Sequence, residues 1–168
     1  MTKNKHASAP LSHRWLAPAL LIWSLLASPP GRCEDSAIQS LAEAAKPLVY
    51  ALTLVGTPYR PGGSDPQSGL DCSGLVKHVY AQTAELELPR TAAAISQQGE
   101  PVEQEQLKPG DLVFFNTLRR PFSHVGIYKG EGKFVHASST RTGRVLVSDM
   151  NKRYWAKRFD GARRLLSQ

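Results

Sequence analysis

The hydrophobic pattern of this chain changes its period once, near residue 110, and that change limits the folds open to it. Before this point, alanine and leucine recur at helical spacing over residues 36–56, and apolar residues do so again over 72–82. After it come short, β-branched or aromatic stretches bounded by turns, at 111–116, 124–130, 133–138 and 144–150. Helices followed by strands predict an α+β domain in which N-terminal helices pack on an antiparallel sheet.

Proline and glycine suggest where the helices end. Pro47 is expected to split or kink the first helix, because proline lacks the backbone N–H that helical hydrogen bonding needs, and Gly56 is expected to end it. A shorter helix is expected between Arg90 and Gly99, and a short helix or turn followed by a last strand after Arg153. The helix over 72–82 is expected to bury four side chains on one face: Leu75, Val76, Val79 and Tyr80.

The N-terminus is typical of a secretory signal. Basic residues precede an uncharged apolar run, Trp15 to Ala27, and a turn-forming "SPPGRCEDS" follows. The run is shorter than the roughly 20 residues that span a membrane, and Pro18 interrupts it. We therefore predict a signal peptide over residues 1–33, with its cleavage point left open, and one periplasmic domain over 34–168. An uncleaved anchor is the alternative.

The chain has two cysteines, and the fate of the first decides what the second can do. If Cys33 is removed with the signal, Cys72 is left as a lone thiol. If Cys33 is retained, a disulfide with Cys72 is the structural alternative, since exported proteins favour disulfides. Arg32 argues against a lipoprotein, because the residue before a lipidated cysteine is normally small.

Cys72 is expected at the start of its helix, with Asp71 as the N-cap. Unpaired backbone N–H groups at a helix N-terminus lower the pKa of a thiol from its usual value of about 8.5. A histidine partner would lower it further and take the proton. The sequence therefore predicts a nucleophilic Cys72 with a lowered pKa.

Two later histidines are candidates for that partner. Strands joined through "GEG" pair residues whose numbers sum to about 262, so His136 faces Gly126 and shares a face with His124. This placement predicts a base, His124, oriented by His136. His78, six residues along the helix from Cys72, is expected to point away from it. Zinc held by the two histidines and the cysteine is the competing hypothesis, but the ligand spacing is poor, and no metal or other cofactor is expected.

Six stretches carry a family resemblance, in this order: "GTPYRPGGSD", "LDCSGLV", "LPRTA", "LKPGDLVFF", "SHVGIY" and "FVHAS". Together they resemble the NlpC-type cell-wall cysteine peptidases, over about Gly56 to Leu166. The closing "MNKRYWAKRFDGARRLL" is most similar to the Spr (MepS) murein endopeptidase branch. The resemblance implies a papain-like α+β fold without metal.

The same resemblance implies roles for individual residues. Cys72 would be the nucleophile, His124 the base and His136 the third, polar member of a triad. Three further residues would line the site or support the oxyanion: Tyr59, Asp71 and Ser73. Their structural alternatives are a packed loop tyrosine, a helix N-cap and a first-turn serine.

The function expected from this resemblance is hydrolysis of peptidoglycan peptides through a thioester acyl-enzyme. A D,D-endopeptidase that cuts diaminopimelate–D-alanine cross-links is favoured. The alternatives are a D-glutamyl-diamino acid endopeptidase, an acyltransferase on the same fold and a non-catalytic wall-binding domain. We expect a monomer whose partners are stem peptides rather than nucleic acid.

The net charge of +7 is concentrated in part after Arg141. These basic residues are expected to form a solvated face, with an anionic partner or weak, salt-sensitive contact with a membrane surface as the alternative.

Overall fold

The structure is a computed structural model that describes residues 32–139 and 142–166, with side chains from Ser36 onward except Ala37. Residues 1–31 of the predicted signal peptide and the side chain of Cys33 lie outside this description. Within the described residues, no helix is long and apolar enough to cross a membrane.

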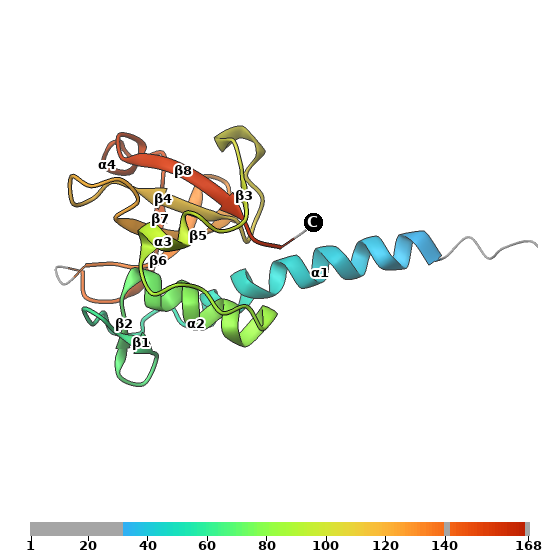
Figure 1. Ribbon diagram of the computed structural model, residues 1–168, viewed down its shortest axis with the longest axis horizontal. Coiled ribbons are helices and arrows are strands. Elements are labelled where there is room, and N and C mark those ends of the chain that lie inside the picture. Colours follow the sequence, from blue (N-terminus) through green and yellow to red (C-terminus); the bar gives the residue numbers. More distant parts are fainter. Residues whose placement is uncertain (1–31, 140–141, 167–168) are drawn as a thin grey trace, which may run out of the picture. The chain divides into compact units, whose positions relative to one another are not determined.

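A six-stranded antiparallel sheet forms the centre of the domain, in the order β3-β8-β4-β5-β6-β7 (Figure 1). Its strands are β3 (Glu100–Pro101), β4 (Leu112–Phe115), β5 (His124–Gly130), β6 (Lys133–Ala137), β7 (Val145–Asp149) and β8 (Phe159–Arg164). The four strands predicted with bounds are all present, each within one residue of its expected ends, and β8 is the last strand expected after Arg153. A separate two-stranded ribbon joins β1 (Ser64–Asp65) to β2 (Gly69–Leu70).

Two long helices contact one face of this sheet, and the N-terminal part of the first projects beyond the sheet (Figure 1). They are α1 (Arg32–Thr53) and α2 (Cys72–Ala84); the short helices are α3 (Ala92–Ile95), η1 (Gln104–Gln106) and α4 (Arg153–Ala156). The predicted apolar face of α2 is buried as expected. The expected split at Pro47 is wrong, because α1 continues through it. Proline removes only one helical hydrogen bond, and the burial of Leu48 and Ala51 just beyond it favours a continuous helix.

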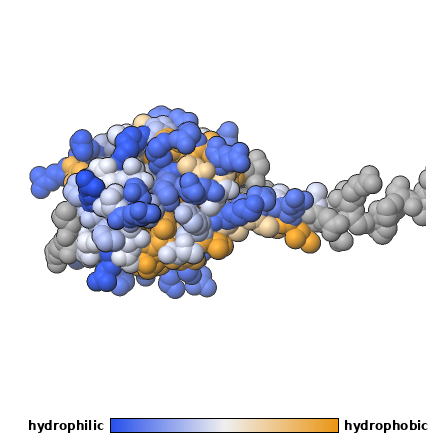
Figure 2. Space-filling model, turned by 90° about the horizontal axis from the view of Figure 1, so that it is seen from below, coloured by the Kyte–Doolittle hydropathy of each residue, from blue (hydrophilic) through white to orange (hydrophobic). Residues whose placement is uncertain are grey.

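The exposed side of α1 remains partly apolar. Figure 2 shows apolar surface along this helix, where Ile38, Leu41 and Val49 are each more than half exposed (65%, 56% and 61%).

The two faces of the sheet bury different cores. On the helix side, Val125, Ile127 and Val135 pack with α1 and α2. On the opposite side lies an aromatic cluster that includes Phe115 and Phe134 and is covered by Trp155. Because side chains alternate along a strand, the residues between those of one core face the other.

The β5–β6 hairpin has the predicted register. Ile127 pairs with Val135 and Tyr128 with Phe134, so the paired numbers sum to 262. Gly126 is a residue of β5 in this hairpin. A Cβ atom at this position would lie 2.6 Å from Cδ2 of Phe134 and 2.8 Å from the Val135 carbonyl oxygen. Contacts that short do not occur between real atoms, so the close approach of the two strands requires glycine at 126.

Two of the C-terminal basic residues form hydrogen bonds or ion pairs with groups inside the domain. Arg164 forms an ion pair of 2.6 Å with the fully buried carboxylate of Asp111, and Arg163 donates to the Ser96 carbonyl oxygen. The expected solvated face therefore does not include their guanidinium groups.

Candidate active site

Cys72 is the first residue of α2, as predicted, and the N-cap before it is firmly held. The Asp71 carboxylate accepts the backbone N–H of Gly74 at 2.7 Å and that of Gly62 at 3.0 Å. It thereby joins the start of the helix to the loop that precedes it. These hydrogen bonds fix the position of the backbone that carries the thiol.

Arg90 completes this N-cap. Its guanidinium forms two hydrogen bonds with Asp71, of 2.7 and 3.0 Å, and a third with the Ser73 hydroxyl at 2.9 Å. Burial alone would raise the pKa of Asp71, but the hydrogen bonds from Arg90 and Gly74 outweigh burial and hold the pKa below its ordinary value. Asp71 is therefore a paired carboxylate at neutral pH.

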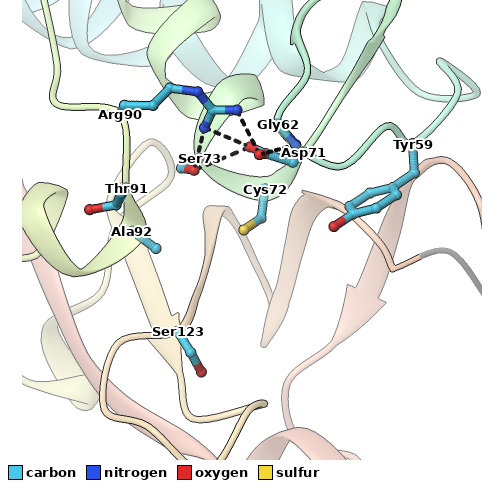
Figure 3. Close-up of a pocket in the computed structure, with 9 residues that line it drawn as sticks. All are labelled: Tyr59, Gly62, Asp71, Cys72, Ser73, Arg90, Thr91, Ala92 and Ser123. Atoms are coloured by element: carbon cyan, nitrogen blue, oxygen red, sulfur yellow. Dashed lines mark hydrogen bonds and ion pairs between the residues drawn. The ribbon is translucent and has the colours of Figure 1, made fainter.

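The thiol faces an open cleft of about 390 Å³. Its lining includes Tyr59, Asp71, Ser73 and Arg90, so the residues expected near Cys72 are brought together there. In Figure 3 the Tyr59 hydroxyl points toward the side where Cys72 lies, and the Cys72 sulfur points away from Tyr59. Burial and the nearby Cys72 raise the pKa of Tyr59, so its hydroxyl remains a hydrogen-bond donor.

The expected lowering of the thiol pKa is wrong. Burial raises the pKa of Cys72, and the negative charge of Asp71 adds to this effect. Backbone N–H groups of Val125, Ser73 and Cys72 itself oppose the rise without reversing it. A helix start does favour a thiolate, but loss of water around the sulfur matters more at this site. The resting group is a neutral thiol that needs a base.

His124 and His136 form a buried pair on one face of the sheet, as the register predicted. Nε2 of His124 lies 2.8 Å from Nδ1 of His136. His124 is 9% exposed to solvent and His136 is 1% exposed. Both rings contact Trp155, with centroid distances of 5.5 and 5.0 Å. The pair therefore belongs to the aromatic side of the sheet.

Burial keeps both imidazoles neutral. It lowers the pKa of His124 to about 4, with Asp71 partly opposing the shift. Burial also lowers the pKa of His136 well below its ordinary value, and the neighbouring His124 adds to that shift. A neutral His124 can accept a proton at neutral pH, which is what a base for Cys72 requires.

The thiol and the histidine pair belong to opposite sides of the sheet. Cys72 packs with the helix-side core, whereas His124 faces the aromatic core. At the start of β5 the backbone N–H of Val125 donates to the sulfur, and His124 is the residue before Val125. No hydrogen bond joins the sulfur to His124 in the part of the chain that the structure describes. Since Nε2 of His124 is engaged by His136, Nδ1 is the nitrogen left for the thiol.

A second cleft, of about 400 Å³, opens beside the histidine pair. It is lined by both histidines with Thr117, Ser138, Tyr154 and Trp155, among others. Two consecutive residues line the two clefts: Ser123 lines the first and His124 the second.

Some site features were not predicted as such. Arg90 stands within the "LPRTA" stretch, which carried the resemblance without giving the arginine a role. Ser148 and Trp155 had no sequence signal, since a serine on a strand and a tryptophan in a short helix are common. His78 lies away from the thiol, as expected, with its ring on Tyr50 and Nε2 3.2 Å from the tyrosine hydroxyl. Among the described residues, no group of three histidine, cysteine or acidic side chains could hold a metal ion.

A papain-like α+β fold with a cysteine at a helix start and a histidine pair on the sheet defines the class of this domain. Residues 56–164 match the sequence model of the NlpC/P60 family, and the chain belongs to that family. It resembles an NlpC/P60 family protein of Bacillus cereus ATCC 10987, with a TM-score of 0.67 and 29% identity over 74% of this chain and 40% of that one.

Named relatives agree with this assignment. The chain is 39% identical to murein DD-endopeptidase MepH of Escherichia coli K12, covering 81% of this chain and 54% of that protein. It is 45% identical to murein DD-endopeptidase MepS/murein LD-carboxypeptidase of the same strain, covering 67% and 58%. It is 43% identical to gamma-DL-glutamyl hydrolase of Bacillus subtilis strain 168, covering 73% and 30%. The chain thus spans between 30% and 58% of the length of these relatives.

Proposed function

We propose that the protein is a cysteine endopeptidase that hydrolyses the peptide part of bacterial peptidoglycan. The observation that supports this proposal is a buried, neutral His124–His136 pair whose strand begins where the Val125 N–H donates to the sulfur of Cys72, a thiol fixed at a helix start. A neutral imidazole supplies the base that a thiol of raised pKa lacks.

The first half of the reaction forms a thioester. As the sulfur of Cys72 attacks a substrate carbonyl carbon, Nδ1 of His124 takes the thiol proton. The carbonyl oxygen becomes an oxyanion, to which the Cys72 backbone N–H and the Tyr59 hydroxyl can donate hydrogen bonds. The tetrahedral intermediate then breaks its C–N bond, and His124 gives its proton to the leaving amine.

The second half returns the enzyme to its starting state. His124 takes a proton from water while the water oxygen attacks the thioester carbonyl carbon. The C–S bond breaks, the acyl group leaves as a carboxylic acid, and the sulfur recovers its proton from His124. His136 keeps the ring of His124 oriented through both halves.

For the bond that is cut, we favour the D,D cross-link between diaminopimelate and D-alanine. The support is the similarity to two proteins named murein DD-endopeptidase. The similarity to gamma-DL-glutamyl hydrolase supports the second candidate, cleavage between D-glutamate and the diamino acid.

We further propose that residues 1–33 are a signal peptide and that residues 34–168 act in the periplasm as a monomer. Arg32 argues against lipid attachment at Cys33. The exposed basic residues near the C-terminus could add weak contact with anionic surfaces. Mass spectrometry of the N-terminus after cell fractionation tests this: an acylated Cys33 would contradict it.

The experiment for the function is digestion of purified sacculi, followed by separation and mass analysis of the muropeptides. A D,D-endopeptidase converts cross-linked dimers into monomers that keep their full stem peptides. The second candidate instead leaves stems that end at D-glutamate. If neither change occurs, the protein is not a peptidoglycan endopeptidase, and a wall-binding role gains support.

A further inference from the structure

A third hydrogen-bonding side chain extends the histidine pair. Nε2 of His136 lies 2.9 Å from the hydroxyl of Ser148, while its Nδ1 meets His124. We propose that Ser148 is a positioning residue that holds the two histidines in the only tautomer able to take the thiol proton. The proposal rests on the proposed function, in which His124 is the base.

The hydrogen bonds allow only two neutral arrangements of protons. In the first, Nε2–H of His124 donates to Nδ1 of His136, whose own proton is on Nε2 and is donated to Ser148. In the second, every proton moves: His136 donates from Nδ1 to His124, Ser148 donates to His136, and His124 carries its proton on Nδ1. Only the first leaves Nδ1 of His124 free to accept a proton from Cys72.

Ser148 supports the first arrangement because it gives the Nε2–H of His136 an acceptor. His136 is 1% exposed, so without the hydroxyl this N–H would be buried and unsatisfied. In the second arrangement the same nitrogen would instead carry an unpaired lone pair, and a buried acceptor without a partner is better tolerated than a buried N–H without one. Loss of Ser148 would therefore present an N–H, rather than a lone pair, to the thiol.

The strand register holds Ser148 in position for this role. Ser148 pairs with Phe134 across β6 and β7, two residues from His136 on the same face of the sheet. Trp155 packs edge-to-face against the His136 ring, with centroids 5.0 Å apart. The serine also borders a cleft of about 270 Å³ lined by Lys133, Asp149 and Lys152, so its own proton can be donated to solvent.

Threonine and valine at position 148 make a matched pair of variants. The two side chains have nearly the same shape, but threonine has a hydroxyl group where valine has a methyl group. We expect S148V to lower kcat by roughly ten- to a hundredfold with KM little changed, because a buried donor loses its acceptor. S148T should stay within about threefold of the wild type, because it keeps the hydroxyl. S148A serves as a second hydroxyl-free variant should the branched side chain disturb the strand.

Nitrogen-15 NMR of the histidine rings reads the tautomer without reference to activity. Wild type and S148T should show His124 protonated on Nε2, and S148V or S148A should shift that proton toward Nδ1. An unchanged tautomer in both hydroxyl-free variants would overturn the proposal, even if activity fell. If the wild type cut no peptidoglycan but the tautomer shifted as expected, the proposed function would fail and the positioning role would stand.

Discussion

The rings of His124 and His136 are joined by a hydrogen bond of 2.8 Å that depends on the absence of a side chain at Gly126. A Cβ atom at position 126 would lie 3.1 Å from the Cβ of His136 and closer still to Phe134 and the Val135 carbonyl. The hairpin can therefore bring the two imidazoles together only because residue 126 of β5 has no side chain. The candidate base and its orienting partner depend on this register.

Replacing Gly126 with alanine should separate the strands where the histidines meet. We expect a loss of about 1–3 kcal/mol in the free energy of unfolding, typical of overpacking in a dense core, together with loss of most activity. Urea denaturation and muropeptide release measure the two effects. Gly130→Ala is the control: it has a positive φ of 103° but no heavy atom closer than 3.7 Å to the new Cβ, so it should cost stability while leaving the histidine NMR signals unchanged. Unaltered activity in Gly126→Ala would contradict this account of the register.

Stability should fall with acid in a window set by the histidines. The pKa of His124 in the folded protein is about 4, below the unfolded value near 6.5, so between these values the unfolded chain binds more protons. The free energy of unfolding should therefore decrease as pH falls from about 6.5 toward 4, with a slope of up to about 1.4 kcal/mol per pH unit for each buried histidine. Urea titrations across this range should show a shallower slope for His136→Asn. A flat profile in the wild type would mean that folding does not lower the pKa of either histidine.

Alkylation of Cys72 should report a raised thiol pKa. Because burial disfavours the thiolate, the rate with iodoacetamide should keep rising with pH beyond the ordinary thiol value of about 8.5. The rate is measured by intact-protein mass, on a Cys33→Ser background so that only one thiol reacts. A rate that reaches its plateau below pH 6 would instead indicate a preformed thiolate–imidazolium pair.

Removing the Arg90 guanidinium should weaken the cap that holds Cys72. Arg90→Ala leaves Asp71 partly buried without its cation, so the pKa of Asp71 should rise, and the stability that its ionised form supplies should be lost at higher pH than in the wild type. We expect a loss of about 1 kcal/mol at neutral pH, since the arginine is partly exposed and screened. Glu87→Ala is the control, because its ion pair with Lys77 is largely exposed and should contribute almost nothing. Equal stability of the two variants would argue against a structural role for the Arg90–Asp71 pair.

The elements of the fold were largely predictable from local pattern. The strands, the hairpin register and the shared face of His124 and His136 follow from a side-chain period of two and a tight turn. The buried face of α2 and the N-cap at Asp71 follow from helical spacing and cap chemistry.

What could not be predicted depends on residues far apart in the chain. Packing of Cys72 against the helix-side core removes water from the thiol and outweighs the effect of the helix start on its pKa, and sequence spacing does not report burial. Arg90 reaches Asp71 from 19 positions away, and Ser148 reaches His136 from the next strand. Packing beyond Pro47 keeps α1 continuous despite the missing hydrogen bond. In each case a tertiary contact outweighs a local preference.

The central claim is that Cys72 is the nucleophile of a peptidoglycan endopeptidase. Its most direct test is the rate at which Cys72→Ala releases muropeptides from purified sacculi, compared with wild type at equal concentration. The substitution removes one sulfur atom from the edge of a cleft, so the midpoint of urea unfolding should change little. We expect release to fall at least a thousandfold, to the level of buffer alone, since the remaining groups have no nucleophile to activate. Release at the wild-type rate by a folded Cys72→Ala protein would contradict the claim.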